Sequence, residues 1–167
     1  MYRYVLGDVI QFVSAWPYKM KVVGRTQQHI NVFGEELMVS NTDRAIAEVS
    51  RRHNAEVHEY TVGPIFMDYQ NAGGHEWLIE FKKAPESLSK YTTDLDYTLR
   101  QLNSDYDAKR YQDMAMKSLS IVPLERGIIE RWQRKNNKYG NQYKLPRLQN
   151  DRKLIESIMT LVASHLA

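Results

Sequence analysis

Alternating apolar and polar positions mark the first part of the chain and predict short strands there. The stretch "RYVLGDVIQFV" is rich in Val, Ile and Phe, so we expect a strand over residues 8–13. A second strand is predicted by "KMKVVGR" over residues 19–25, where Gly24 ends it. The stretch "HINVFGEEL" predicts a third strand, with Gly34 at a turn or bulge.

Apolar residues three and four positions apart predict helices further along. Asn41 is expected to cap a helix that runs to about His53, and a stripe of apolar residues places another over residues 88–102. Asp105 is expected to cap a short helix toward Met114, and residues 128–136 to form a further helix. Asn150 or Asp151 should cap the last helix, whose apolar stripe comprises Leu154, Ile155, Ile158, Leu161 and Val162.

Two longer runs, "AEVHEYTVGPIFMDY" and "HEWLIEFKK", flank the loop "QNAGG" and predict a long hairpin. Trp77, Ile79 and Phe81 alternate along its second run and should share one face. One more strand is predicted by "KSLSIVPL". The irregular order of strands and helices predicts an α+β fold, with a mixed β-sheet of about four or five strands and α-helices packed on it.

Composition narrows the class of protein. The 167 residues suffice for one domain with a core, and 43% hydrophobic with 26% charged residues is ordinary for a globular domain. The sequence has no run near the roughly 18 apolar residues of a membrane helix, and its beginning lacks a signal-peptide cleavage pattern. Without cysteine it has no disulfide, thiolate zinc site or cysteine nucleophile, and we expect a cytoplasmic protein without a membrane partner.

Charge and titratable residues give little sign of a self-contained active site. The net charge is +3, and the densest basic stretch, "RWQRKNNK", is expected to be a solvated helix end, so nucleic acid is not an expected partner. The five histidines lack the helical spacing of a metal site, and no metal is predicted. The acid pairs Glu35–Glu36 and Asp94–Asp96 are expected to be solvated. The chain contains neither a GxSxG elbow nor a Gly-x4-Gly-Lys-Ser/Thr phosphate loop.

Three short stretches have polar residues that a scaffold does not need. In "YRYVLGD", Asp8 opens a strand, where its carboxylate can accept hydrogen bonds from two ribose hydroxyls or can simply be a turn aspartate. "VVGRTQQHINVFGEEL" contains a Gly–Arg pair that is otherwise a β-turn with a surface arginine. "GNQYKLPRL" holds Lys144 between Tyr143 and a stiffening Leu-Pro pair, and the plain alternative is a loop lysine pointing into water.

Taken in order, these stretches resemble the C-terminal part of adenylate-forming enzymes, and within them the Gretchen Hagen auxin-responsive family of acyl-acid amido synthetases. The resemblance extends over nearly the whole chain. It rests on "YRYVLGDV", "EYTVGPI" with "GGHEWLIEF", "LNSDYDAKR" and "NQYKLPR".

The resemblance implies a ligase that uses ATP. Such an enzyme converts a small carboxylic acid to an acyl-adenylate and then transfers the acyl group to an amino acid. It also implies that the chain is a piece whose partner is a missing large N-terminal domain, which would supply the phosphate loop and acyl pocket and, with the nucleotide, the magnesium. Residues 1–24 would then be junction strands and residues 25–167 the small C-terminal domain, expected to be inactive alone.

Individual roles follow from the same resemblance. Asp8 matches the acid that binds the ribose of ATP, and Lys144 the catalytic lysine that reaches the phosphates. Gly24 and Arg25 match the interdomain hinge, with Arg25 counted among the nucleotide-binding residues. Gln27 departs from the Asp or Lys usual two residues after that arginine, which puts the pivot position in question. Arg147 either supports the loop or approaches the nucleotide, and we prefer the supporting role.

Two other functions stay open on the sequence. A non-catalytic module could bind a protein or single-stranded RNA through exposed sheet aromatics, for which Tyr60, Tyr69 and Trp77 are the candidates. Glu76 and Glu80 flank that strand and would repel phosphate. The second possibility is a purely structural or dimerising domain.

Overall fold

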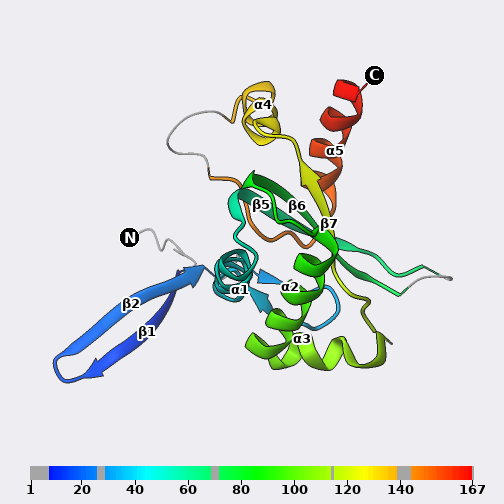
Figure 1. The fold of residues 1–167 in the computed structure, drawn as a ribbon. Helices are drawn as coiled ribbons and strands as arrows, with labels where there is room; N and C mark the ends of the chain where they lie inside the picture. The colour runs from blue at the N-terminus through cyan, green and yellow to red at the C-terminus, as the bar shows by residue number, and fades with distance from the viewer. Residues whose placement is uncertain (1–7, 26–28, 69–71, 114, 139–143, 167) are drawn as a thin grey trace.

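The computed structural model describes residues 8–25, 29–68, 72–113, 115–138 and 144–166. Within these residues the fold is α+β, as predicted, with strands and helices mixed along the chain (Figure 1). The strands are β1 (Asp8–Ala15), β2 (Tyr18–Arg25), β3 (His29–Ile30), β4 (Leu37–Met38), β5 (Glu56–Ile65), β6 (Gly74–Lys83) and β7 (Ser120–Leu124). The helices are α1 (Val39–Arg52), α2 (Leu88–Leu102), α3 (Ser104–Lys109), the 3-10 helix η1 (Tyr111–Asp113), α4 (Ile128–Lys135) and α5 (Lys153–Leu166).

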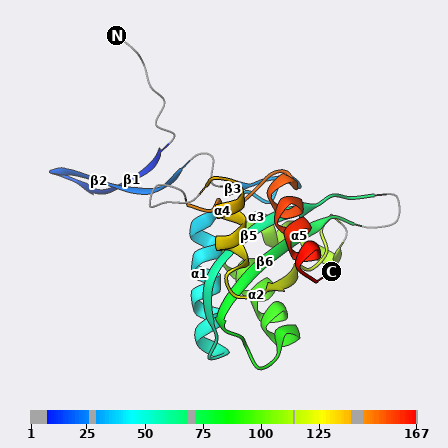
Figure 2. The same cartoon turned by 90° about the horizontal axis from the view of Figure 1, so that it is seen from above.

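The described strands do not share one sheet but form three. The central sheet is mixed and has the order β5-β6-β7, with β5 antiparallel and β7 parallel to β6. The pairs β1–β2 and β3–β4 are separate two-stranded sheets. In the described ranges the mixed sheet has three strands rather than the four or five predicted, because β1 and β2 pair with each other and form a hairpin that projects away from the rest (Figures 1 and 2).

Both faces of the central sheet are covered by helices, which divides the core in two. Trp77 and Ile79 face a cluster to which α1 and α2 contribute, including Ile46 and Leu95. Leu78 points the opposite way, into a cluster with residues of α4 and α5. This alternation is the period of two expected of a strand, and Figure 1 shows the two helix pairs on opposite sides of the sheet.

The predicted third strand is shorter than expected: its first two residues form β3, and a tight loop containing Gly34, the predicted turn or bulge, leads to β4. Gly34 and Glu36 have φ values of 83° and 39°, which break the strand. The reason is the carboxylate of Glu35, whose oxygens accept hydrogen bonds from the backbone N–H groups of Val32, at 3.3 Å, and Phe33, at 2.7 Å. An acid that satisfies its own loop in this way favours a turn over an extended strand.

Two predicted helix caps are wrong by a few residues. Helix α1 begins at Val39, so Asn41 lies in its first turn, where its Oδ1 accepts a hydrogen bond from the N–H of Met38 at 3.1 Å. The cap of α3 is Asn103, whose Oδ1 accepts from the N–H of Tyr106 at 2.7 Å, rather than Asp105. The last helix begins at Lys153, and Asp151, one of its two predicted caps, accepts a hydrogen bond from the N–H of Lys153 at 3.0 Å. None of the helices in the described ranges is long and apolar enough to cross a membrane.

Candidate functional site

The segment that follows Lys144 lies along the outer edge of β5. The hydroxyl of Thr61 donates to the carbonyl of Pro146 at 2.8 Å, and the N–H of Val62 donates to the carbonyl of Arg147 at 2.8 Å. The N–H of Gln149 donates in return to the carbonyl of Val62 at 2.9 Å. These bonds and a parallel bridge between Val62 and Leu148 make the segment a short added strand.

Two leucines fix this segment to both halves of the core. Leu145 is buried in the cluster with α4 and α5, and Leu148 in the cluster with α1 and α2. Pro146, which is predicted to stiffen the segment, is exposed. The two buried leucines and the edge of β5 also hold the segment in place, and the stiffening by Pro146 stays a prediction. Tyr143, the other predicted stiffener, lies outside the described residues.

Lys144 itself is exposed. It makes no hydrogen bond or ion pair with any residue in the described part of the chain. An ammonium that is neither buried nor paired keeps its full charge available for an anionic group that approaches the loop. The structure thus provides a cation at the beginning of an immobilised segment.

Arg147 is held by the protein itself. Its guanidinium carbon lies 4.4 Å from the ring centroid of Tyr60, and its nitrogens lie 3.2 Å from Glu59 and 3.4 Å from Asp43. Tyr60 in turn donates a hydrogen bond to Asp43, and burial together with that bond raises the pKa of Tyr60 well above its ordinary value. The phenol of Tyr60 therefore stays protonated and donates to Asp43. The contacts of Arg147 with Tyr60, Glu59 and Asp43 are of the kind expected for a residue that supports the loop.

Asp8 and Arg25 lie opposite each other at the end of the β1–β2 hairpin. Their backbones are paired in register, and the side chains of both fall outside what the structure describes. The turn between β1 and β2 lies at the opposite end of the hairpin, and it is that end that projects away from the central sheet (Figures 1 and 2). The assignment of Asp8 and Arg25 to the nucleotide stays a prediction.

The side chain of Asn150, which the sequence predicts only as a possible helix cap, links the beginning of β3 to the segment that follows Lys144. Its Nδ2 donates to the carbonyl of His29 at 2.9 Å, and its Oδ1 accepts from the N–H of Asn31 at 2.8 Å. The sequence carries no local signal for this contact, because its partners lie 121 and 119 positions away.

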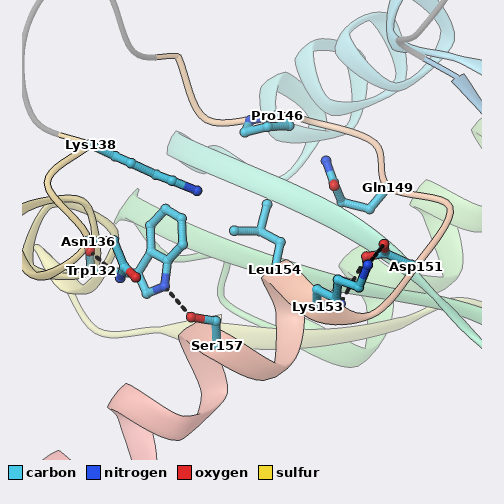
Figure 3. Close-up of a pocket in the computed structure, with 9 residues that line it drawn as sticks. All are labelled: Trp132, Asn136, Lys138, Pro146, Gln149, Asp151, Lys153, Leu154 and Ser157. Atoms are coloured by element: carbon cyan, nitrogen blue, oxygen red, sulfur yellow. Dashed lines mark hydrogen bonds and ion pairs between the residues drawn. The ribbon is translucent and has the colours of Figure 1, made fainter.

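A cavity of about 310 Å³ lies beneath residues 144–150, which we call the lysine segment (Figure 3). Helix α4 and the residues after it line one side, and α5 lines another; the lining residues are Trp132, Asn136, Lys138, Pro146, Gln149, Asp151, Lys153, Leu154 and Ser157. Both lysines have protein partners: the ammonium of Lys138 lies 5.1 Å from the Trp132 ring, and that of Lys153 lies 3.5 Å from Asp151. The cavity therefore offers mixed chemistry without a preformed anion site.

Two acids expected to be solvated are buried. Glu35 is 0% exposed and lies 2.8 Å from Nε2 of the equally buried His75. Asp96 accepts from both Nε and Nη2 of the buried Arg110, at 3.0 and 2.9 Å, and from the hydroxyl of Tyr106 at 2.6 Å. Both acids are fully engaged in structural pairs. No group of three metal-ligating side chains occurs within the described ranges, so these residues form no metal site there.

Two of the three aromatics proposed for binding RNA are buried. Tyr60 is 1% and Trp77 0% exposed, and their rings stack on each other at 5.6 Å. Tyr69 lies outside the described residues. Glu76 pairs with Arg152, and Glu80 accepts a hydrogen bond from the N–H of Gly127. Because bases stack only on exposed rings, the alternative of an interaction module loses the surface on which it depended.

Comparison with known proteins decides the family. Residues 40–153 match the model described as the GH3 family C-terminal domain. The chain belongs to the GH3 family. The match includes α1, the central sheet and the lysine segment, and it confirms the resemblance drawn from the motifs.

Solved structures show the same fold. A GH3.15 acyl acid amido synthetase matches 98% of the chain with a TM-score of 0.75 at 15% identity. A second structure, titled AtGH3.15 acyl acid amido synthetase in complex with 2,4-DB, matches 96% with a TM-score of 0.75 at 16% identity. The chain spans 31% and 30% of the length of these two structures. No curated protein matches the chain by sequence.

Proposed function

We propose that this GH3 domain is the small C-terminal domain of an ATP-dependent acyl-acid amido synthetase, and that Lys144 acts in its adenylation step. The observation that carries the proposal is the state of Lys144: an exposed ammonium, without a partner in the described chain, at the start of a segment locked to β5. Membership in the GH3 family supplies the context. The substrates would be ATP, a small carboxylic acid and an amino acid.

The proposed role of Lys144 is electrostatic. When a carboxylate attacks the α-phosphate of ATP, negative charge grows on the phosphoryl oxygens and on the departing pyrophosphate. An ammonium at about 4 Å contributes roughly 4 kcal/mol of attraction at an effective dielectric near 20. Removal of one comparable stabilising group typically costs about 10²–10³ in rate. Lysine suits this role because its charge sits at the tip of a long, flexible stem.

The segment that follows Lys144 is fixed to the core and would therefore position the ammonium of Lys144 for the reaction. Positioning a catalytic group before the reaction removes part of the entropic cost of reaching the transition state. Leu145 and Leu148 provide this positioning from the two core clusters, and Arg147 adds its contacts to Tyr60 and Glu59. Lys144 would approach the nucleotide for adenylation and withdraw for amide formation as the domain turns.

The remaining parts of the proposal concern the junction and the larger partner. Asp8 would bind the ribose hydroxyls, and Arg25 would lie at the hinge and contact the nucleotide. Residues 1–24 would belong to the junction and residues 25–167 to the small domain. A large N-terminal domain would supply the phosphate loop, the acyl pocket and the magnesium that accompanies the nucleotide. The exposed apolar residues of the β1–β2 hairpin, such as Phe12 and Trp16, support a partner on that side.

The test is to join this chain to the N-terminal part of a GH3 amido synthetase and to measure the two half-reactions separately. We expect Lys144→Ala to slow ATP–pyrophosphate exchange by about 10²-fold or more, with a much smaller effect on aminolysis of a supplied acyl-adenylate. Lys90→Ala, which removes an exposed lysine from α2, is the matched control. Equal losses in both half-reactions, or no exchange in the joined protein, would contradict the proposal.

A further inference from the structure

We propose that Asn150 is a positioning residue that couples the beginning of β3, which we call the entrance of the domain, to the segment carrying Lys144. The inference rests on the proposed function, because it concerns how Lys144 is placed when the domain turns. Two regions predicted to work together, the Gly24–Arg25 junction and the Lys144 segment, lie at opposite ends of the sequence. The side chain of Asn150 bonds the first described residues after that junction to the lysine segment.

The bonding pattern imitates a neighbouring strand. Nδ2 of Asn150 donates to the carbonyl of His29 at 2.9 Å, and its Oδ1 accepts from the N–H of Asn31 at 2.8 Å. A residue of a parallel strand binds its neighbour through the carbonyl of one residue and the N–H of the residue two positions on. A side-chain amide carries one donor and one acceptor on the same carbon, so it can take the place of the N–H and C=O of one residue in such a strand. A carboxylate lacks the donor, and an aliphatic side chain lacks both.

Each side of this contact is fixed to the body of the domain. Ile30, between the two bonded residues, is fully buried and pairs with Leu37 of β4. On the other side, Gln149 is bonded to Val62 of β5, and Leu148 is buried. Asn150 is itself exposed, so its value lies in linking two anchored segments rather than in filling the core.

The hydrogen bond between Asn150 and His29 matters because His29 lies close to the predicted hinge. Strand β2 ends at Arg25 and β3 begins at His29, so the contact joins the lysine segment to the chain soon after the predicted pivot. Rotation at the junction then carries both as one body. Without the bond, β3 is held by its two-residue pairing with β4 and by the burial of Ile30, so its position relative to the lysine segment is less well fixed. A misplacement of about 1 Å in a catalytic group can cost about 10²-fold in rate.

The test uses the same joined synthetase and two substitutions. We expect Asn150→Asp, which keeps the shape and removes the donor, to slow pyrophosphate exchange about tenfold, part of the cost of a full misplacement. Asn150→Ala, which removes both bonds, should slow exchange at least as much. Aminolysis of a supplied acyl-adenylate should change little in either variant.

Asn103→Asp is the matched control. Asn103 also donates from Nδ2 to a distant carbonyl, that of Glu36 at 3.2 Å, and accepts from a backbone N–H as the cap of α3. Aspartate keeps this cap and removes only the donor. The control should leave both half-reactions near the unsubstituted rates, while thermal unfolding of each variant reports the folded fraction.

A second measurement separates a positioning role from a merely structural one. If Asn150 acts through Lys144, then Asn150→Asp should cause no further loss of exchange in a protein that already carries Lys144→Ala. A further tenfold loss in that background, or equal losses in both half-reactions, would overturn the inference. Those results would leave the proposed function intact, since its own test is the unequal effect of Lys144→Ala alone.

Discussion

Glu35 illustrates how a single residue can be misjudged from its sequence neighbours. Burial alone would raise the pKa of its carboxyl, but the hydrogen bond and charge of His75, with backbone N–H groups, outweigh this and hold the pKa below its ordinary value. The exposed Glu36 beside it is the solvated acid that the sequence predicts. One glutamate is buried and the other exposed because the loop at Gly34 directs their side chains to opposite sides.

The lowered pKa of Glu35 gives a pH prediction for stability. A group whose pKa is depressed on folding adds stability above its unfolded pKa, and this is lost as the pH falls through the folded pKa. We expect the free energy of unfolding to fall as the pH drops below the ordinary value of 4.5, and less steeply in Glu35→Gln. Urea denaturation across this range measures both slopes, with Glu36→Gln as the control. Identical slopes in Glu35→Gln and the unsubstituted protein would refute the assignment.

Glu35→Gln should also destabilise the protein at neutral pH. Removing the charge from one member of a buried pair costs up to about 3–5 kcal/mol, and the loss is smaller here because glutamine can still accept hydrogen bonds. The expected loss is therefore about 1–3 kcal/mol. The same urea titrations at pH near 7 provide the value.

At the scale of elements, the regular helices follow from sequence and their ends do not. Helix α2 was predicted over residues 88–102 and spans Leu88–Leu102, because its apolar stripe marks a whole face. The ends of α1 and α3 were shifted because several capping residues stand together at each start. Which of Asn103 and Asp105 caps α3 depends on where the backbone turns, and α2 decides that by ending at Leu102.

The approach of α5 to β5 gives a prediction at the same scale. A methyl group at Gly63 would meet Cγ1 of Ile155 at 2.6 Å and the carbonyl of Asp151 at 3.4 Å. Gly63→Ala should therefore push the start of α5 away from the sheet and cost about 1–3 kcal/mol. Gly74→Ala is the control, because its nearest neighbours lie at 3.7 Å. Thermal unfolding compares the two, and equal stability would show that α5 adjusts without cost.

At the scale of the whole molecule, the β1–β2 hairpin stands apart from a body that is otherwise covered. Trp16 is 86%, Tyr18 72%, Phe12 61% and Met20 61% exposed. Helices protect the central sheet on both sides, whereas the described aromatic side chains of this hairpin contact one another, as Phe12 contacts Tyr18 with 6.1 Å between their ring centroids. A cluster of large apolar side chains in water indicates a surface that meets another protein part.

The predicted consequence is that the hairpin contributes to binding of the large domain. Replacing the cross-strand neighbours Phe12 and Met20 by serine should weaken association with the N-terminal part of a GH3 synthetase by about 10²-fold or more, because burying each side chain is worth roughly 1.5–3 kcal/mol. Titration calorimetry measures the affinity. Serine at Gln11 and Lys21, the polar neighbours in the same register, is the control. Unchanged affinity in the Phe12 and Met20 variant would exclude the hairpin from the interface.

The sequence by itself determined the type of nearly every element, the family and the lysine segment. Those features depend on residues that are close in the sequence. The period of the apolar residues shows which side of an element is buried, and the residues of a motif are adjacent. Tertiary structure alone decided which polar groups meet. Glu35 finds His75 across 40 positions and Asn150 finds Asn31 across 119, and no local pattern encodes such pairs. Packing the helices on both sides of the sheet brings these groups together, and burial then makes a partner necessary for Glu35 and His75.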